Sequence, residues 1–228
     1  MNEMFSRTIG VIGEENFKKL NNSSVIVFGL GGVGGSACEA LVRSGVGTVA
    51  IVDKDIVDIT NLNRQIIATQ DTIGLNKTDA MEKRLLSINP KVKIIKYNLF
   101  YLPETADEIQ LSQFDFVLDC IDNVTAKLEL CQRCKEEKVP IISSMGTGNK
   151  LHPEMLEIAD ISKTSVCPLA RVMRRELKKR GIEKLPVVYS KEEPSKTELS
   201  VPGSTSFTPS VAGYLMCSFV VRKILNID

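Results

Sequence analysis

The stretch SSVIVFGLGGVGG, residues 23–35, constrains the fold more than any other part of the chain. Residues 25–29 have the apolar composition of a buried strand, and the glycines follow directly. Gly29, Gly31 and Gly34 have the spacing G-x-G-x-x-G, which allows a tight turn and a close approach of the backbone to an anion. The stretch therefore predicts a strand, a phosphate-binding turn and a helix start, although a tight turn with nothing bound has the same pattern.

Strand and helix patterns alternate after this corner, which indicates an α/β fold. We predict a doubly wound, Rossmann-like, mainly parallel sheet with an elaborated C-terminal portion. The expected strands are 25–29, 48–53, 92–97, 114–120 and 139–143, and the expected helices are 33–44, 76–87, 103–111 and 124–137.

The 228 residues read as a single domain, 1–228. An N-terminal arm, 1–20, has the spacing of one or two short helices, and a nucleotide-binding core spans 23–150. In the C-terminal portion, 151–228, we expect a strand at 155–161, a helix at 168–180, an edge strand at 186–190, a mobile loop at 191–206 and a buried helix at 211–225.

Composition excludes several kinds of site. The chain has one histidine, His152, so a three-histidine metal site is excluded. Its net charge is +1, so nucleic-acid binding would need a local basic patch. No apolar run approaches the ~18 residues of a membrane span, and residues 1–10 have no apolar core of a signal peptide. We expect a cytoplasmic protein with reduced thiols.

Polar residues gather where predicted strands end. Asp53 ends the second strand, 19 residues after Gly34, which suits hydrogen bonds to a ribose. The polar loop that follows includes Asn61 and Arg64, and Lys77 falls in the first turn of a helix, where the dipole disfavours a cation. This misfit hints that Lys77 meets an anion, although a solvated lysine has the same pattern.

The fourth strand leads into Asp122 and Asn123, at the edge of the sheet where open α/β folds bind ligands. The next helix has a C-x-x-C pair, Cys131 and Cys134, which offers two of the four ligands of a zinc site, so we expect no structural zinc. Cys167 precedes a proline-started helix, a position that fits either a stabilised thiolate or an unreactive cap residue.

Basic residues recur on the helix 168–180. Arg171, Arg174, Arg175 and Lys178 are spaced i, i+3, i+4, i+7 and form one stripe. Such a stripe is either a solvated face or a contact for an anionic partner. Arg7, in the arm, reads by pattern alone as a solvated surface arginine.

Four motifs together resemble the ubiquitin-activating-like adenylating enzymes, the ThiF/MoeB/HesA group. They are GLGGVGG, IVDKDIVDITNLNRQ, GLNK and LDCIDN, and the resemblance covers residues from about 5 to 150. It implies an adenylation domain with ATP and Mg²⁺, in which Gly32 and its neighbours lie on the phosphates. It also implies a homodimer, because Arg7 matches an arginine that reaches the neighbouring subunit's ATP site. The implied ATP-binding residues are Gly29, Gly31, Gly32, Gly34, Asp53, Asp55, Asn61, Arg64, Lys77, Asp122 and Asn123, with Asp122 on Mg²⁺ and catalysis by Arg64, Lys77, Asp122 and Arg7.

Within this group the whole chain resembles the dehydratases that act on threonylcarbamoyladenosine in tRNA. Four segments carry this resemblance. They are the arm around Arg7, residues 63–66, the residues from Lys163 to the arginine-rich helix, and the residues from Ser206 to the last helix. It implies tRNA as partner and ATP-dependent cyclisation of the modified adenosine beside the anticodon, through an adenylated carboxylate. Arg171, Arg174, Arg175 and Lys178 then become candidate tRNA contacts.

Other functions stay open at this stage. An activator of a ubiquitin-like sulfur-carrier protein would use the same chemistry with a sulfur-transfer or carrier protein as partner. Gly203 and Ser204 stand where the subfamily can carry a cysteine, which disfavours a thioester route. A NAD-binding oxidoreductase or nucleotide sensor would leave Arg64, Lys77 and Asp122 without a role, and a non-catalytic scaffold would leave the whole triphosphate site unused.

Overall fold

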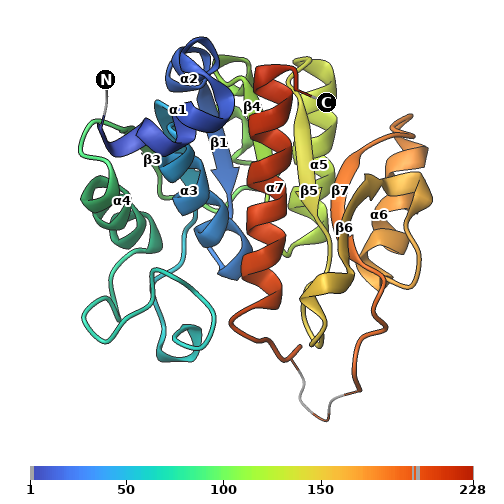
Figure 1. Ribbon diagram of the computed structural model, residues 1–228. Helices are drawn as coiled ribbons and strands as arrows, with labels where there is room; N and C mark the ends of the chain where they lie inside the picture. The colour runs from blue at the N-terminus through green and yellow to red at the C-terminus, as the bar shows by residue number, and fades with distance from the viewer. Residues whose placement is uncertain (1–2, 197, 199–200, 228) are drawn as a thin grey trace.

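A computed structural model describes residues 3–196, 198 and 201–227 of the chain. Within this part, seven strands form one sheet in the order β3-β2-β1-β4-β5-β7-β6 (Figure 1). β6 runs antiparallel to β7, and every other pairing is parallel. The strands are β1 Ser24–Phe28, β2 Thr48–Val52, β3 Lys93–Tyr97, β4 Phe116–Asp119, β5 Ile141–Ser144, β6 Leu156–Asp160 and β7 Pro186–Ser190. The predicted doubly wound, mainly parallel α/β fold is confirmed.

The helices follow the predicted pattern closely. They are α1 Ser6–Ile12, α2 Glu14–Asn21, α3 Gly32–Ser44, α4 Lys77–Ile88, α5 Val124–Glu136, α6 Pro168–Lys179 and α7 Thr208–Leu225. Lys77 opens α4 and Pro168 opens α6, as the sequence predicted. None of the helices in the described ranges is long and apolar enough to cross a membrane.

Three expectations about local structure were wrong. Residues 103–111 do not form a helix but include the short 3-10 turn η3 Ala106–Glu108, with a second turn, η4 Leu111–Gln113, at their end. The Thr105 hydroxyl accepts the N–H of Leu102 and donates to the carbonyl of Phe100, which holds the backbone in a non-helical loop.

β7 is an inner strand, because β6 covers its outer edge. α7 is not buried all round: Tyr214 is 49% exposed. Residues 191–206 contain no helix or strand where they are described, and 197, 199 and 200 lie outside the described residues.

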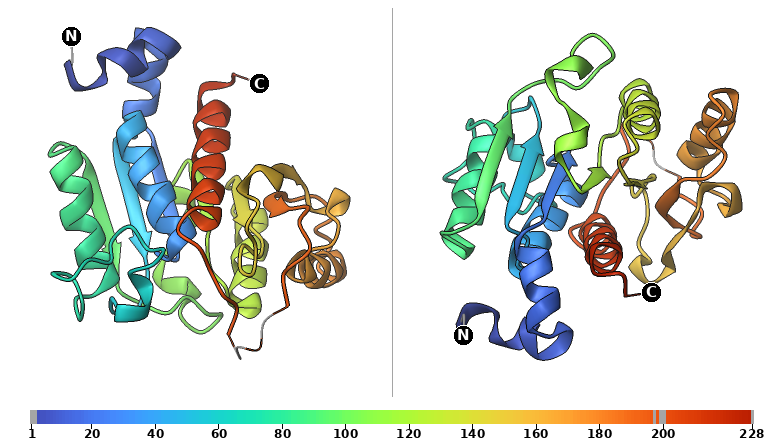
Figure 2. Two further views of the ribbon diagram at one scale, coloured as in Figure 1. Left: turned by 60° about the horizontal axis from the view of Figure 1, so that its bottom comes forward. Right: turned by 90° about the horizontal axis from the view of Figure 1, so that it is seen from above.

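Along a strand, successive apolar side chains point to opposite faces of the sheet and pack into two separate hydrophobic cores. Val25 and Val27 of β1 pack with α3, α4 and α7. Ile26 and Phe28 pack on the other face with α5 and the 3-10 turns. A third cluster joins α5 to α6 and β7. The views of Figure 2 show the sheet between these helical layers. A side chain at Gly213 would lie 2.3 Å from the carbonyl oxygen of Val33, so this glycine lets α7 lie directly on α3.

The chain order of the strands places a topological switch point between β1 and β4, and we call the region between the loops that follow these two strands the crevice. From β1 the chain proceeds to β2 and β3 on one side, and then returns to β4 on the other side of β1. Loops at the carboxyl ends of β1 and β4 therefore leave in opposite directions, and open α/β sheets bind ligands at such a point. The glycine corner follows β1 here, and the loop 120–123 follows β4.

Candidate active site

Close packing fixes the glycine corner, yet its middle is open. Gly29 has φ +86°, and a Cβ there would lie 2.7 Å from the carbonyl oxygen of Cys120. A Cβ at Gly34 would lie 1.8 Å from the carbonyl oxygen of Gly29. By contrast, Gly31 has nothing within 4 Å of its hypothetical Cβ. Gly31 caps α3 without a side chain, so the first N–H groups of the helix, from Gly32 on, are available to an anion.

Asp53 joins the end of β2 to this corner. One carboxylate oxygen accepts the backbone N–H of Leu30 at 2.7 Å, and the other accepts the N–H of Asp55 at 2.9 Å. Asp53 therefore positions the glycine corner directly, which the sequence did not reveal.

Lys77 is buried and turned toward two carboxylates. Its side chain is 8% exposed, and its ammonium lies 3.0 Å from Asp55 Oδ2 and 4.0 Å from Asp53 Oδ2. The anion that offsets its unfavourable place in the first turn of α4 is thus Asp55. Since the Asp55 side chain is 54% exposed, solvent partly screens its attraction to the Lys77 ammonium, and a phosphate could replace the Asp55 carboxylate.

The polar loop between β2 and α4 folds over the corner. Asn61 is buried, and its side-chain oxygen accepts the N–H of Asp58. Arg64, half-buried, donates to the carbonyl of Thr60 and to the Asn63 side chain, and Asn63 donates to the carbonyl of Ser204. The segment before α7 therefore reaches this edge of the sheet. Pro209 also does so, lying 3.0 Å from a Cβ placed on Gly32.

Gln65 is a candidate residue that the sequence reasoning left without a role. Its Oε1 is buried and has no hydrogen-bond partner in the described part of the chain. A buried acceptor without a partner costs about 1–3 kcal/mol, so a bound ligand or water would stabilise it. Its position directly after Arg64, a predicted ATP-binding residue, is the sequence feature that could have indicated a role for Gln65.

Asp122 and Asn123 follow β4 on the other side of the crevice. The Asn123 side chain accepts the N–H of Ala126 at 3.0 Å and caps α5. Asp122 is exposed, and its carboxylate has no hydrogen-bond or ion-pair partner among the described residues. Mg²⁺ is commonly held by one or two carboxylates together with phosphate oxygens and water, so a free carboxylate beside a phosphate site fits this ion. The described ranges contain no cluster of three or more His, Cys, Asp or Glu that would hold a metal alone.

Arg7 lies far from the glycine corner of its own chain. α1 packs at the end of the molecule where the strands begin, whereas the corner follows the opposite end of β1 (Figure 1). The side chain of Arg7 is exposed. Arg7 is therefore the one predicted catalytic residue that the fold does not bring to the crevice.

The basic stripe on α6 is divided by the structure. Arg174 turns inward and donates to the carbonyl oxygens of Ile161 and Thr164 and to the Thr164 hydroxyl. Its guanidinium thus fastens the segment before α6. Arg171, Arg175 and Lys178 are exposed, and Arg175 pairs with the neighbouring Glu176.

The cysteines are all free thiols. Cys131 and Cys134 are buried in α5, and burial raises the pKa of each thiol well above its ordinary value. Cys167 caps α6 and is also buried. The C-x-x-C pair thus consists of protonated, packed thiols at neutral pH.

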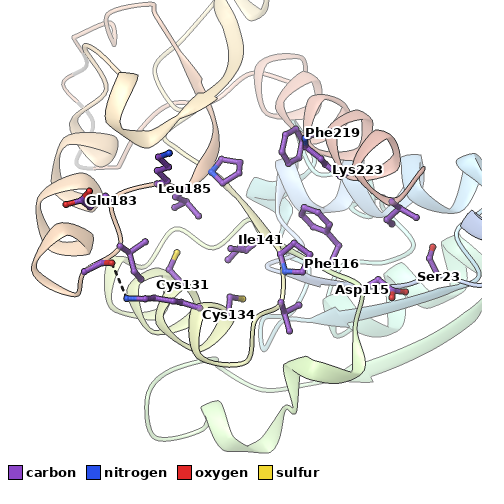
Figure 3. A pocket seen from close by; sticks show the side chains of 18 of the residues that line it. Ser23, Asp115, Phe116, Cys131, Cys134, Ile141, Glu183, Leu185, Phe219 and Lys223 are labelled. Atoms are coloured by element: carbon purple, nitrogen blue, oxygen red, sulfur yellow. Dashed lines mark hydrogen bonds between the residues drawn. The ribbon is translucent and has the colours of Figure 1, made fainter. Parts of the chain in front are cut away.

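A pocket of about 1020 Å³ opens at the other end of the sheet (Figure 3). Phe116 and Ile141, at the starts of β4 and β5, lie between the ends of α5 and α7 here. None of the residues described above for the crevice lines this pocket. It is therefore separate from the candidate nucleotide site.

Known proteins resemble this chain over most of its length. The model of the ThiF family matches residues 5–228. The tRNA threonylcarbamoyladenosine dehydratase of Bacillus subtilis is 42% identical, over 99% of this chain and 96% of its own length. The enzyme of the same name from Escherichia coli is 34% identical over 77% of this chain and 66% of its own length.

Solved structures show the same fold. E. coli tRNA N6-threonylcarbamoyladenosine dehydratase, TcdA, in complex with AMP superposes with a TM-score of 0.93 at 29% identity, covering 98% of this chain and 94% of that one. The complex of TcdA with ATP gives a TM-score of 0.90 at the same identity and coverage.

Proposed function

The chain belongs to the ThiF family, and from this premise we propose that it is an ATP-dependent tRNA threonylcarbamoyladenosine dehydratase. The observation that supports this substrate is the similarity to the B. subtilis dehydratase over almost the whole of both chains. ATP is supported by the AMP and ATP complexes of TcdA and by the open glycine corner at the switch point of the sheet. We place the reaction in the cytoplasm, where tRNA and ATP occur together.

The reaction has two displacement steps. The carboxylate of the substrate's threonine moiety attacks the α-phosphorus of ATP, the bond to the bridging oxygen breaks, and pyrophosphate leaves. A neighbouring group of the same side chain then attacks the acyl carbon, loses its proton and expels AMP. One substrate oxygen departs in the AMP, so the modified adenosine loses the elements of water.

The residues of the crevice suit the first step. The nucleophile is already an anion, so the main barrier is the charge on the phosphoryl oxygens. The N–H groups at the start of α3 face the phosphates. The ammonium of Lys77 exchanges Asp55 for the triphosphate, and Arg64 closes on it from the loop. Asp122 would hold Mg²⁺, which neutralises phosphate charge when it is bound.

A homodimer would complete the site. Since Arg7 lies at the opposite end of its own subunit, it could serve an ATP site only in a second copy. Apolar side chains on the arm support an interface there, because Val11 is 85% exposed and Met4 48% exposed. Closed twofold dimers are the commonest protein assemblies, and in them each arm would reach the other subunit's site.

Arg171, Arg175 and Lys178 are the residues of α6 that we propose to contact tRNA phosphates, with Arg174 as their structural support. The test replaces Arg171 and Lys178 by glutamate. The matched control replaces Lys91 and Lys93, which are exposed at the start of the edge strand β3, by glutamate. We expect the first variant to bind tRNA at least about tenfold more weakly at low salt, with unchanged ATP binding, and the control to bind normally. Equal tRNA affinity of both variants would remove this surface from the proposal.

The experiment that tests the proposed activity uses tRNA from cells lacking this protein. The tRNA is incubated with the protein, ATP and Mg²⁺, digested to nucleosides and analysed by mass spectrometry. We expect threonylcarbamoyladenosine to lose one water only when ATP is present, together with release of AMP and pyrophosphate. An unchanged nucleoside, with pyrophosphate exchange that depends instead on a ubiquitin-like sulfur-carrier protein, would replace the dehydratase by a carrier-activating enzyme.

A further inference from the structure

An ion pair without any solvent exposure lies directly behind the crevice. Lys127, in the first turn of α5, places its ammonium 2.9 Å from Oδ2 of Asp119, the last residue of β4. Both side chains are 0% exposed. Burying two charges costs several kcal/mol for each ion, and well-packed apolar residues often give equal stability. The helix dipole also disfavours a cation at this place. Stability alone therefore does not account for the pair.

The pair holds the backbone residue that precedes Asp122. Lys127 donates to the carbonyl oxygen of Ile121 at 3.0 Å, and Asp119 Oδ1 accepts the N–H of Ile121 at 3.2 Å. Ser143, on the adjacent strand β5, donates to the same Asp119 carboxylate at 2.6 Å. The N–H and the carbonyl of Ile121 are thus both hydrogen-bonded to buried charged groups. The hydroxyl of Ser143, on β5, orients the Asp119 carboxylate.

The same loop presses on the glycine corner. The Cys120 carbonyl leaves no room for a Cβ at Gly29, as described above. A displacement of residues 120–121 would therefore be transmitted to the turn that receives the phosphates.

We propose that Lys127 is a positioning residue of the adenylation site. Together with Asp119 and Ser143 it fixes the peptide groups of Ile121, and so sets where the Asp122 carboxylate stands relative to the nucleotide phosphates. Lys127 itself contacts neither nucleotide nor metal. The inference rests on the proposed ATP and Mg²⁺ site, and it assigns a role to a lysine that otherwise reads as one more charge on α5.

The test replaces the pair by neutral residues, Lys127→Met with Asp119→Asn, so that no unpaired charge stays buried. The matched control is Glu39→Gln with Arg84→Met, which removes an ion pair between α3 and α4 that does not touch the loop. Three quantities are measured for each protein: the melting temperature, the affinity for ATP with and without Mg²⁺ by calorimetry, and hydrogen exchange at residues 121–123.

We expect the Lys127 variant to lose about tenfold or more in affinity for ATP with Mg²⁺, the range usual when partners of a metal ligand are removed. Binding of ATP without metal should change less, and exchange at residues 121–123 should accelerate. The control should melt lower without either effect. Lys127→Arg, which keeps a charge for Asp119 and a donor for Ile121, should restore most of the Mg²⁺ dependence.

Mg²⁺-dependent binding equal to that of the wild type, with only a lower melting temperature, would reduce Lys127 to a structural residue and overturn the inference. If the double variant does not fold, Ser143→Ala tests the same point with a loss of about two- to fivefold, and no loss there overturns it equally. Failure of the wild type to bind ATP with Mg²⁺ would instead contradict the proposed function.

Discussion

Arg7 offers the sharpest prediction, because the fold separates it from the crevice of its own chain. We consider two inactive variants. Arg7→Ala keeps an intact crevice and loses the arm arginine, whereas Lys77→Ala loses the crevice lysine and keeps the arm. If each site takes Arg7 from the other subunit, a mixed dimer contains one complete site, formed by the crevice of the first variant and the arm of the second.

The expected activity follows from counting sites. When equal amounts are mixed and subunits exchange freely, about half of the dimers are mixed, and half of the sites in these are complete. Activity should therefore recover to about a quarter of the wild-type value per subunit. The assay is the rate of water loss from threonylcarbamoyladenosine after the two variants have been unfolded and refolded together.

A second mixture provides the control. Lys77 and Asp122 lie on the same side of the interface, since both belong to one crevice, so mixing Lys77→Ala with Asp122→Ala should recover nothing. Recovery in this control would contradict the assignment of both residues to one site. No recovery from the Arg7 and Lys77 mixture, with exchange proved by mass-tagged subunits, would refute the transfer of Arg7 between subunits.

Three further predictions concern stability. Gly34→Ala, whose methyl group would meet the Gly29 carbonyl oxygen at 1.8 Å, should cost about 1–3 kcal/mol and lower the Tm by several degrees, whereas Gly31→Ala in open space should leave the Tm nearly unchanged. Burial raises the pKa of Glu39, but hydrogen bonds from Arg43 and Arg84 outweigh it and hold the pKa below its ordinary value of 4.5. Its stabilisation is therefore present above that pH and lost below it, so the difference in urea unfolding between wild type and Glu39→Gln should shrink on acidification, and a constant difference would contradict this. Arg174→Ala should cost about 1–3 kcal/mol because it leaves the carbonyl of Thr164 without its guanidinium donor, whereas Arg171→Ala, tested by the same thermal melt, should cost almost nothing.

The core of the fold could be predicted because its signals are local. Each inner strand is a short apolar run, and glycine or asparagine and proline mark the ends of the helices between them. The inner place of β7 could not be predicted, because it depends on two pairings between segments distant in the chain, with β5 on one side and with β6 on the other. The predicted helix at 103–111 is wrong because the Thr105 hydroxyl bonds to the backbone of Phe100 and Leu102 and favours a loop, a local competition that the sequence pattern does not show.

The sequence could predict the edge of the sheet where most of the candidate residues meet, because they follow the ends of parallel strands. What the sequence could not show is which charges the protein uses internally. Arg174 and Arg175 are neighbours in one stripe, yet only Arg174 folds back onto the backbone. Lys77 and Lys127 each lie in the first turn of a helix, and only packing distinguishes the lysine that faces the crevice from the one buried behind it.

The pairing of β5 with β7 has a consequence for how the two halves of the sheet are attached to each other. Only Ser143 and Ser144 pair with β7, at Val187 and Val188, whereas β1 and β2 pair along five residues. The strands separate toward their starts, where the pocket of Figure 3 opens between Ile141 and Leu185. This pairing is the shortest register in the sheet, so the attachment of β6, α6 and β7 to the nucleotide half rests largely on the apolar cluster that joins α5 to α6 and β7. The exposed arginines of α6 therefore lie on a part of the molecule that side-chain packing, more than strand pairing, holds to the ATP-binding half.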